Sequence, residues 1–159
     1  MDDIKQKQLD ALLRHIGLVR NNCQLLAERL IEKGEEELGI KLIANSLIHD
    51  NSKFFGLEWL FLNAESKEKQ PELFKLASEH HTSSNPHHPE FHCGGIKSMP
   101  QLYLAEMVAD WKSRSDEVGD DIHEWIRVKA SKRYKYTPNS KVYQDIKKYL
   151  EMILEKPFK

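Results

Sequence analysis

The chain has 159 residues, of which 40% are hydrophobic and 31% charged, and its formal net charge at pH 7 is −1. This length suits one folded domain over residues 1–159, and the near-neutral charge argues against a general nucleic-acid binder, which would be basic. Neither a membrane-spanning apolar run nor a signal peptide can be recognised in the sequence, so we expect a cytoplasmic protein without a membrane partner.

Apolar residues recur at helical spacing through most of the first half of the chain. The spacing predicts a helix over residues 9–31 that ends at Gly34, and a second, largely buried helix over residues 36–49. A short aromatic helix is expected over residues 54–63. Another begins at Pro71, a residue favoured in the first turn, and runs to about residue 81.

Residues 82–100 contain three prolines, two glycines and no periodicity, which predicts a long irregular loop. Helices are expected again over residues 99–115 and from Asp120 or Asp121 through residue 128. Thr137 is expected to cap the last helix, with Pro138 in its first turn. Since no strand pattern appears, the predicted fold is all-α, a bundle of about six to seven helices with a histidine-rich loop.

Histidine is unusually concentrated: five of the eight histidines lie in residues 80–92. Imidazoles and carboxylates, the ligands that suit divalent transition metals, occur on four separate predicted elements. Three of these positions lie in apolar sequence, where an unpaired carboxylate would be costly. The candidate metal ligands are His15, His49, Asp50, His81, His87, His88 and Asp110.

Each candidate also has an ordinary structural interpretation. His15 could be a core histidine, residues 50–52 could cap the next helix, and Asp110 could pair with Arg114 one turn along. Glu106 could be an ordinary helix acid. The ordered series of a histidine, a His-Asp pair, further histidines and an aspartate is more specific than any of its parts.

This series resembles the HD superfamily of helical metal-dependent phosphohydrolases. The motifs "HDNSKF", "HHTSSNPHHPEF" and "EMVADWKSRS", within residues 10–115, are also similar to a small family of bacterial and phage proteins. The helices over residues 120–155 carry no motif that can be transferred. The resemblance implies that His15, His49, Asp50 and Asp110 bind one metal, and that His81 with His87 or His88 completes a second site.

The resemblance further implies hydrolysis of a nucleotide or another small phosphate ester by a metal-activated water. Asp50 would bridge the metals and, with Lys53, act in catalysis. Lys53 would contact the substrate phosphate, although it could equally be a solvated surface lysine, and Arg14, Arg20 and Arg114 are further candidates. One or two ions of Fe, Mn, Co, Ni or Zn are expected. Asn85 and Glu90 could order the loop.

Two other functions fit the same residues. A di-iron HD-type oxygenase of a small substrate would use the same series, and a non-catalytic, metal-containing nucleotide-binding protein would use the metal to hold the fold. Four residues are expected not to bind the metal: His80, His92, Cys93 and His123. Cys23 and Cys93 are expected to be free thiols, because two cysteines are too few for a disulfide framework.

Overall fold

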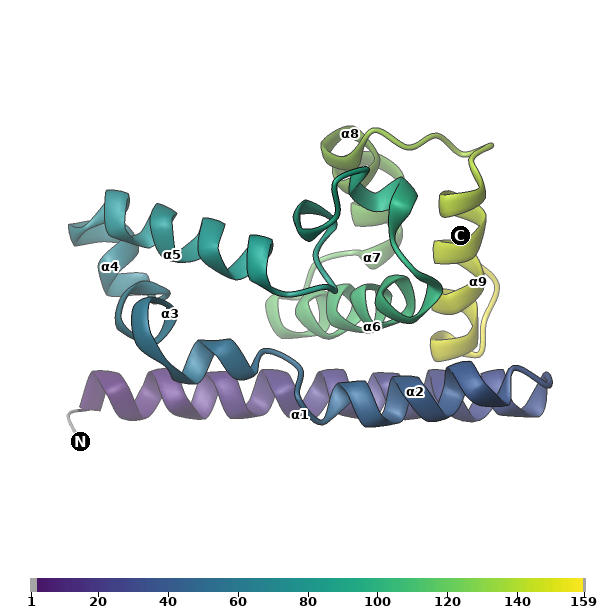
Figure 1. Ribbon diagram of the computed structural model, residues 1–159, viewed down its shortest axis with the longest axis horizontal. Coiled ribbons are helices and arrows are strands. Elements are labelled where there is room, and N and C mark those ends of the chain that lie inside the picture. Colours follow the sequence, from purple (N-terminus) through teal and green to yellow (C-terminus); the bar gives the residue numbers. More distant parts are fainter. Residues whose placement is uncertain (1–2, 159) are drawn as a thin grey trace.

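The computed structural model describes residues 3–158, and this part of the chain is mostly helical and contains no strand, so the predicted all-α class is confirmed. The long helix α1 (Asp3–Glu32) runs along one side of the molecule, and α2 (Glu36–Ser46) returns antiparallel beside it (Figure 1). By the rise of an α-helix, the 30 residues of α1 span about 45 Å. These two helices form the base on which the other elements pack.

The middle of the chain forms shorter elements at one end of this base (Figure 1). They are the 3₁₀ helix η1 (Asn51–Phe54), α3 (Gly56–Phe61), α4 (Ala64–Lys69) and α5 (Pro71–Ser84). Pro71 occupies the first turn of α5 as predicted. The loop that follows contains two short 3₁₀ turns, η2 (Pro89–Phe91) and η3 (Gly95–Ser98).

The last third of the chain covers the other end of the base. It contains α6 (Gln101–Val118), α7 (Ile122–Glu124), the π-helix η4 (Trp125–Ala130), α8 (Ser131–Tyr134) and α9 (Lys141–Leu154). Of the described helices, none is both long and apolar enough to cross a membrane.

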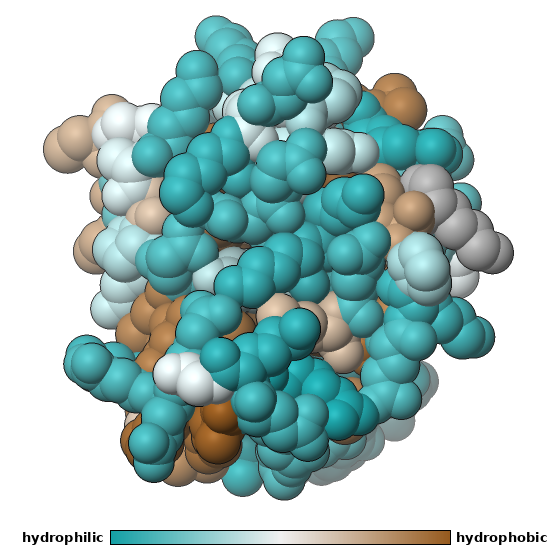
Figure 2. Space-filling model, turned by 90° about the vertical axis from the view of Figure 1, so that its right-hand side faces the viewer, coloured by the Kyte–Doolittle hydropathy of each residue, from teal (hydrophilic) through white to brown (hydrophobic). Residues whose placement is uncertain are grey.

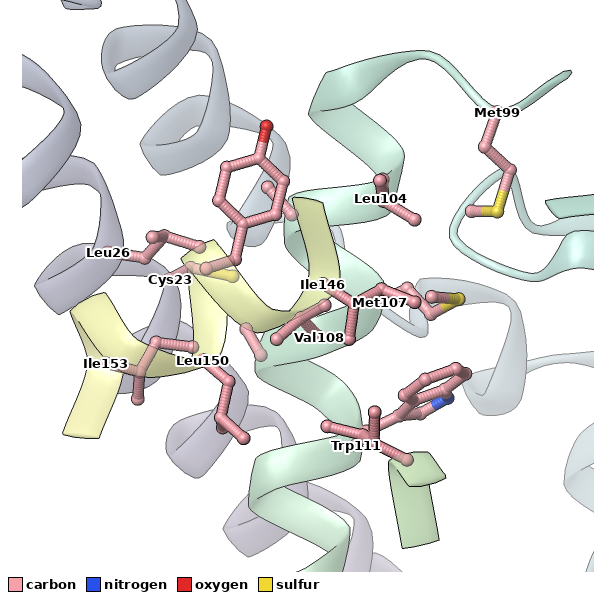
Figure 3. Packing of buried hydrophobic residues seen from close by; sticks show 14 of the residues in the cluster. Cys23, Leu26, Met99, Leu104, Met107, Val108, Trp111, Ile146, Leu150 and Ile153 are labelled. Atoms are coloured by element: carbon pink, nitrogen blue, oxygen red, sulfur yellow. The ribbon is translucent and has the colours of Figure 1, made fainter. Parts of the chain in front are cut away.

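The main hydrophobic core lies between α1, α6 and α9. Figure 3 shows Ile146, Leu150 and Ile153 of α9 directed toward α1 and α6. Leu26 of α1 and Val108 of α6 meet them, and both are fully buried. The core therefore fixes α1 relative to α6, and these two helices also carry His15 and Asp110.

Two glycines explain how α1 and α2 pair. Gly34 adopts a left-handed backbone (φ 84°) that ends α1 at the predicted position, and the Glu35 amide then donates to the Leu30 carbonyl at 2.8 Å. On α2, a Cβ at Gly39 would lie 2.8 Å from the Ala27 carbonyl oxygen, so only glycine lets the helices approach this closely.

The sequence placed the start of the last helix wrongly and missed another helix. The last helix begins at Lys141, and Ser140 caps it by accepting a bond from the Tyr143 amide at 3.3 Å, whereas Thr137 and Pro138 lie in the turn before it. Both Thr137 and Ser140 have capping chemistry, and the sequence did not separate them. Helix α4, which was not predicted, is capped by the Asn63 side chain.

The surface at the end of the molecule formed by α9 and the α1–α2 turn is largely hydrophilic (Figure 2). Hydrophobic side chains reach the surface at the lower edge of that view, where α1 and α2 lie. On α2 and the turn after it, the exposed hydrophobic side chains are those of Ile40, Ile43, Leu47 and Ile48. The helix thus buries one face only, although its sequence predicted a central, mostly buried position.

Candidate metal centre

The segment after α2 directs a carboxylate into the interior. Helix α2 ends at Ser46, earlier than predicted, and residues 47–50 form a turn. Asp50 closes this turn with a left-handed backbone (φ 56°, ψ 18°), and only 1% of its surface is exposed. Aspartate adopts this backbone more readily than most residues other than glycine, and here it turns the Asp50 carboxylate into the interior.

Four imidazole rings face the Asp50 carboxylate. The Nε2 atoms of His81 and His87 lie 3.3 and 3.4 Å from Asp50 Oδ1. The Nε2 atoms of His15 and His49 each lie 3.6 Å from Asp50 Oδ2. The two carboxylate oxygens therefore face two different pairs of histidines, which come from α1, α5, the turn after α2 and the histidine-rich loop.

Two further candidates complete the cluster. The Nε2 atom of His88 lies 2.9 Å from His81 Nε2, and Oδ1 of Asp110 lies 3.1 Å from His15 Nε2. Both His87 and His88 thus lie beside Asp50, whereas the resemblance implied only one of them as a ligand. All seven predicted ligands meet in one place.

Possible ligand atoms fall into overlapping groups whose members lie within 4.8 Å of one another. One group is made of Asp50, His81, His87 and His88, and a second of His15, His49 and Asp50. A third combines His49 and His87 with Asp110. Because Asp50 belongs to the first two groups, one through each oxygen, its carboxylate has the position of a bridge between two cations.

Three glutamates orient the rings from behind. Glu117 Oε2 lies 2.9 Å from Nδ1 of His15, and Glu106 Oε1 lies 2.8 Å from Nδ1 of His49. Glu58 Oε2 lies 2.8 Å from Nδ1 of His81. An ionised carboxylate only accepts hydrogen bonds, so each Nδ1 carries the proton and each Nε2 of a neutral ring presents its lone pair to the centre.

The sequence did not identify these three glutamates. For α6 a signal existed: Glu106 and Glu117 lie one turn before and two turns after Asp110, hence on the same helical face. Glu106 also accepts a hydrogen bond from Asn45. Glu58, in a six-residue helix, carried no such signal, yet it is only 1% exposed.

The residues fit a divalent transition metal. Among the described residues, His49 Nε2, Asp50 Oδ1 and His87 Nε2 are buried without a hydrogen-bond partner. A buried polar atom left unpaired costs about 1–3 kcal/mol, so three such atoms at one point are unfavourable unless something binds them. Imidazole nitrogens and carboxylate oxygens together suit Mn, Fe, Co, Ni or Zn.

Burial and local charge set the protonation states. Burial, with the nearby Lys53 ammonium, lowers the pKa of His81 to about 2, and burial with the neighbouring His87 lowers that of His88 to about 3. Both rings are therefore neutral at pH 7. Burial alone would raise the pKa of Asp110. The hydrogen bond to His15 and the nearby histidines outweigh burial and lower this pKa, so the carboxylate stays ionised.

Two further rings of the cluster have raised pKa values. Burial lowers the pKa of His15, but the hydrogen-bonded Asp110 outweighs it, and the net pKa is raised. At His49 burial is likewise outweighed, chiefly by Asp50 and Glu106. A raised pKa favours the protonated form of these rings, and a metal ion would compete with that proton, because only neutral imidazole is a ligand.

The proposed phosphate-binding residues differ in position. Lys53 Nζ lies 2.5 Å from Asp50 Oδ2, and its side chain is 23% exposed, so it adjoins the cluster. Arg114 is 67% exposed and contacts Glu117, so it pairs neither with Asp110 nor with the cluster directly. Arg14 and Arg20 are exposed, and among residues 3–158 no contact joins either to the cluster.

The remaining histidines and cysteines lie outside the cluster. His80 Nδ1 is 2.7 Å from Glu58 Oε1, and His92 Nε2 is 2.7 Å from the Pro86 carbonyl oxygen. His123 packs against Phe158. Both cysteines are free thiols as predicted, Cys23 in the core and Cys93 at the surface.

Two residues of the loop have structural roles. The Asn85 side chain donates to the Ser52 hydroxyl and to the His81 carbonyl, which ties the start of the loop to η1 and α5. Glu90 accepts from Arg133 at 2.8 Å and joins the loop to α8. Both contacts hold the segment that carries His87 and His88.

Comparison with known proteins gives one match. A model of a family of unknown function (DUF5662) matches residues 5–156, which is nearly the whole chain. Searches of curated proteins and of solved structures found no match.

Proposed function

The chain belongs to a family of unknown function (DUF5662), and from its site we propose that it is a metal-dependent phosphohydrolase acting on a nucleotide or another small phosphate ester. One observation carries the proposal: the buried Asp50 carboxylate lies between two groups of histidine Nε2 atoms, one group at each oxygen. The ordered series of histidines and aspartates, which resembles that of the HD superfamily, supports it.

The ligands in this proposal form two sets that share Asp50. His81, His87 and His88 would hold one ion, and His15 and His49, with Asp110 nearby, would hold the other. Two divalent ions that share a water lower its pKa toward neutrality and neutralise the phosphoryl oxygens of a bound ester. Glu58, Glu106 and Glu117 keep the imidazole lone pairs directed at this point.

Lys53 supplies a partly exposed cation beside the cluster. Its ammonium pairs with the same oxygen, Asp50 Oδ2, that faces His15 and His49. A divalent ion at that oxygen would compete with the Lys53 ammonium, because like charges repel. The displaced ammonium would then pair with a substrate phosphate.

Access to the cluster is uneven, which suits a small substrate. His49, His81, His87 and Asp50 are buried, whereas the side chains of His15 and Asp110 keep 12% and 15% exposure. Together with the partly exposed Lys53 and His88, these atoms are the part of the cluster that solvent reaches. A phosphate group would enter past them, while the buried histidines remain shielded.

The test combines metal content with a phosphatase screen. Protein purified with its native metal should contain at least about half an equivalent of a transition metal. It should also release phosphate from nucleotides or generic phosphoesters with Mn, Co, Ni or Fe. The matched variants are His81→Ala and His80→Ala, because both rings bond to Glu58 but only His81 faces Asp50.

We expect His81→Ala to lose metal and activity, and His80→Ala to keep both. Absence of metal from the wild type, or equal losses in the two variants, would refute the proposed centre. Metal without phosphate release from any substrate would refute the hydrolase alone.

A di-iron oxygenase is the second candidate, because five imidazoles form a donor set that suits iron. Bound iron with oxygen-dependent turnover, and no phosphate release, would favour it. Metal without any turnover would favour a non-catalytic binding protein.

A further inference from the structure

A second candidate binding site lies outside the metal cluster. A pocket of about 460 Å³ lies between residues 89–97 of the loop and residues 133–135 at the end of α8. This volume is in the range of small-molecule sites, and no cluster residue lines the pocket. Its occupant would therefore not touch the ligands of the metal centre.

Most of the charged side chains that line this pocket are cationic. Lys97, Arg133 and Lys135 line it, against Glu90 as the one carboxylate. Arg133 pairs with Glu90 at 2.8 Å, but within residues 3–158 neither Lys97 nor Lys135 forms an ion pair. Since the whole chain is nearly neutral, the two unpaired lysines are a local excess of positive charge.

The backbone of Lys135 adds an independent observation. This residue ends α8 with a left-handed backbone (φ 55°), a conformation in which glycine or asparagine is the usual choice. A lysine at such a position costs stability, and strain of this kind concentrates at binding sites. The strained residue is one of the three cations of the pocket.

The pocket also offers apolar surface. Pro89 and Ile96 are buried at its wall, and Tyr134 is held in place by stacking on Trp111, with ring centroids 5.8 Å apart. The Arg133 guanidinium lies over the Tyr134 ring, 5.1 Å from its centroid. A ligand that fits this wall combines an organic body with more than one negative charge.

We propose that this pocket binds a small organic polyanion, such as a molecule that bears two or more phosphate groups. The cations lie on two segments of the chain. They therefore suit a ligand with separated anionic groups better than a ligand with a single carboxylate. The site is independent of the metal-dependent activity, because its lining is not shared with the cluster.

Calorimetric titration of the purified full-length protein with inorganic pyrophosphate tests this proposal. The double variant Lys97→Ala/Lys135→Ala removes the unpaired cations of the pocket. The matched control is Lys129→Ala/Lys132→Ala, which removes two exposed lysines of η4 and α8 that do not line it. Any binding at the metal centre is the same in both variants, so their difference reports on the pocket.

We expect the pocket variant to weaken pyrophosphate binding about tenfold or more, and the control to stay within about twofold of wild type. Equal weakening in both variants would mean diffuse attraction by surface charge and would overturn the proposal, as would absence of binding to the wild type. Orthophosphate, with less charge, is expected to bind more weakly than pyrophosphate.

A single substitution separates binding from folding. Lys135→Gly relieves the left-handed strain, so we expect the melting temperature to rise by about 2–4 °C while pyrophosphate binding weakens. A purely structural Lys135 would leave pyrophosphate binding unchanged in this variant, and that result would also overturn the proposal.

Discussion

Replacing Glu58 with glutamine tests whether the buried carboxylates tune the imidazole ligands. Glu58 Oε2 accepts hydrogen bonds from His81 Nδ1 and the Ser52 hydroxyl, both at 2.8 Å, and Oε1 lies 2.7 Å from His80 Nδ1. The amide oxygen of glutamine can replace the first acceptor. Its NH₂ group can donate to His80, because that ring is 53% exposed and is free to change its tautomer. The substitution therefore removes the negative charge and keeps the geometry.

A carboxylate behind a ligating histidine raises the basicity of that ligand, and its loss typically lowers metal affinity about 10- to 100-fold. This corresponds to roughly 1.4–2.7 kcal/mol of binding free energy. Competition with a chelator at pH 7.5 measures it directly. Glu79→Gln is the matched control, because Glu79 lies on α5, the helix that carries His81, but is 64% exposed. If Glu58→Gln binds metal within twofold of wild type, or weakens it no more than Glu79→Gln, the reasoning is refuted.

Three more predictions concern Lys53, the bound metal and the hydrophobic core. Lys53→Ala should lower kcat/KM on a phosphate ester about tenfold or more while metal content stays unchanged, and a loss of metal would contradict the role assigned to Lys53. Chelation should lower the melting temperature, because removal of the metal leaves buried carboxylate and imidazole atoms of the cluster without a partner. Identical melting curves with and without metal would argue against the centre. Leu150→Ala removes a fully buried core side chain and should cost about 2–5 kcal/mol in urea unfolding, with metal affinity unaffected; a variant as stable as wild type would contradict the packing.

Periodicity was a good guide to the long helices because the core selects one face of each. The buried face of α9 includes Ile146, Leu150 and Ile153, which recur at helical spacing in the sequence. Helix ends depend on weaker local hydrogen bonds, which explains why Thr137 was chosen over Ser140. Ile40 and Ile43 show a different limit: an apolar face predicts burial, but the sequence does not say whether another element covers it.

The candidate ligands could be found from the sequence because their residue types are expensive in apolar surroundings. Asp110 is an example, since a carboxylate among core residues needs a partner and His15 provides one. The glutamates behind the rings were not found, because Glu58 acts through a contact with α5 that only the fold creates. Glutamate is common on helices, and its type alone does not distinguish a buried acceptor from a surface charge.

The two halves of the cluster are anchored differently, and this has a consequence for the order of folding. His15 and Asp110 lie on α1 and α6, which the main core holds together, whereas His81, His87 and His88 lie on α5 and the loop. Within α5 only Ala77 and His81 are buried, and the helix packs mainly on α3 and α4 (Figure 1). Local unfolding begins where few apolar contacts resist it, so amide hydrogens of α3–α5 should exchange sooner than those of α1 and α6. In a folding chain the α1–α6 half would form first, and metal uptake would be the step that closes the other half over it.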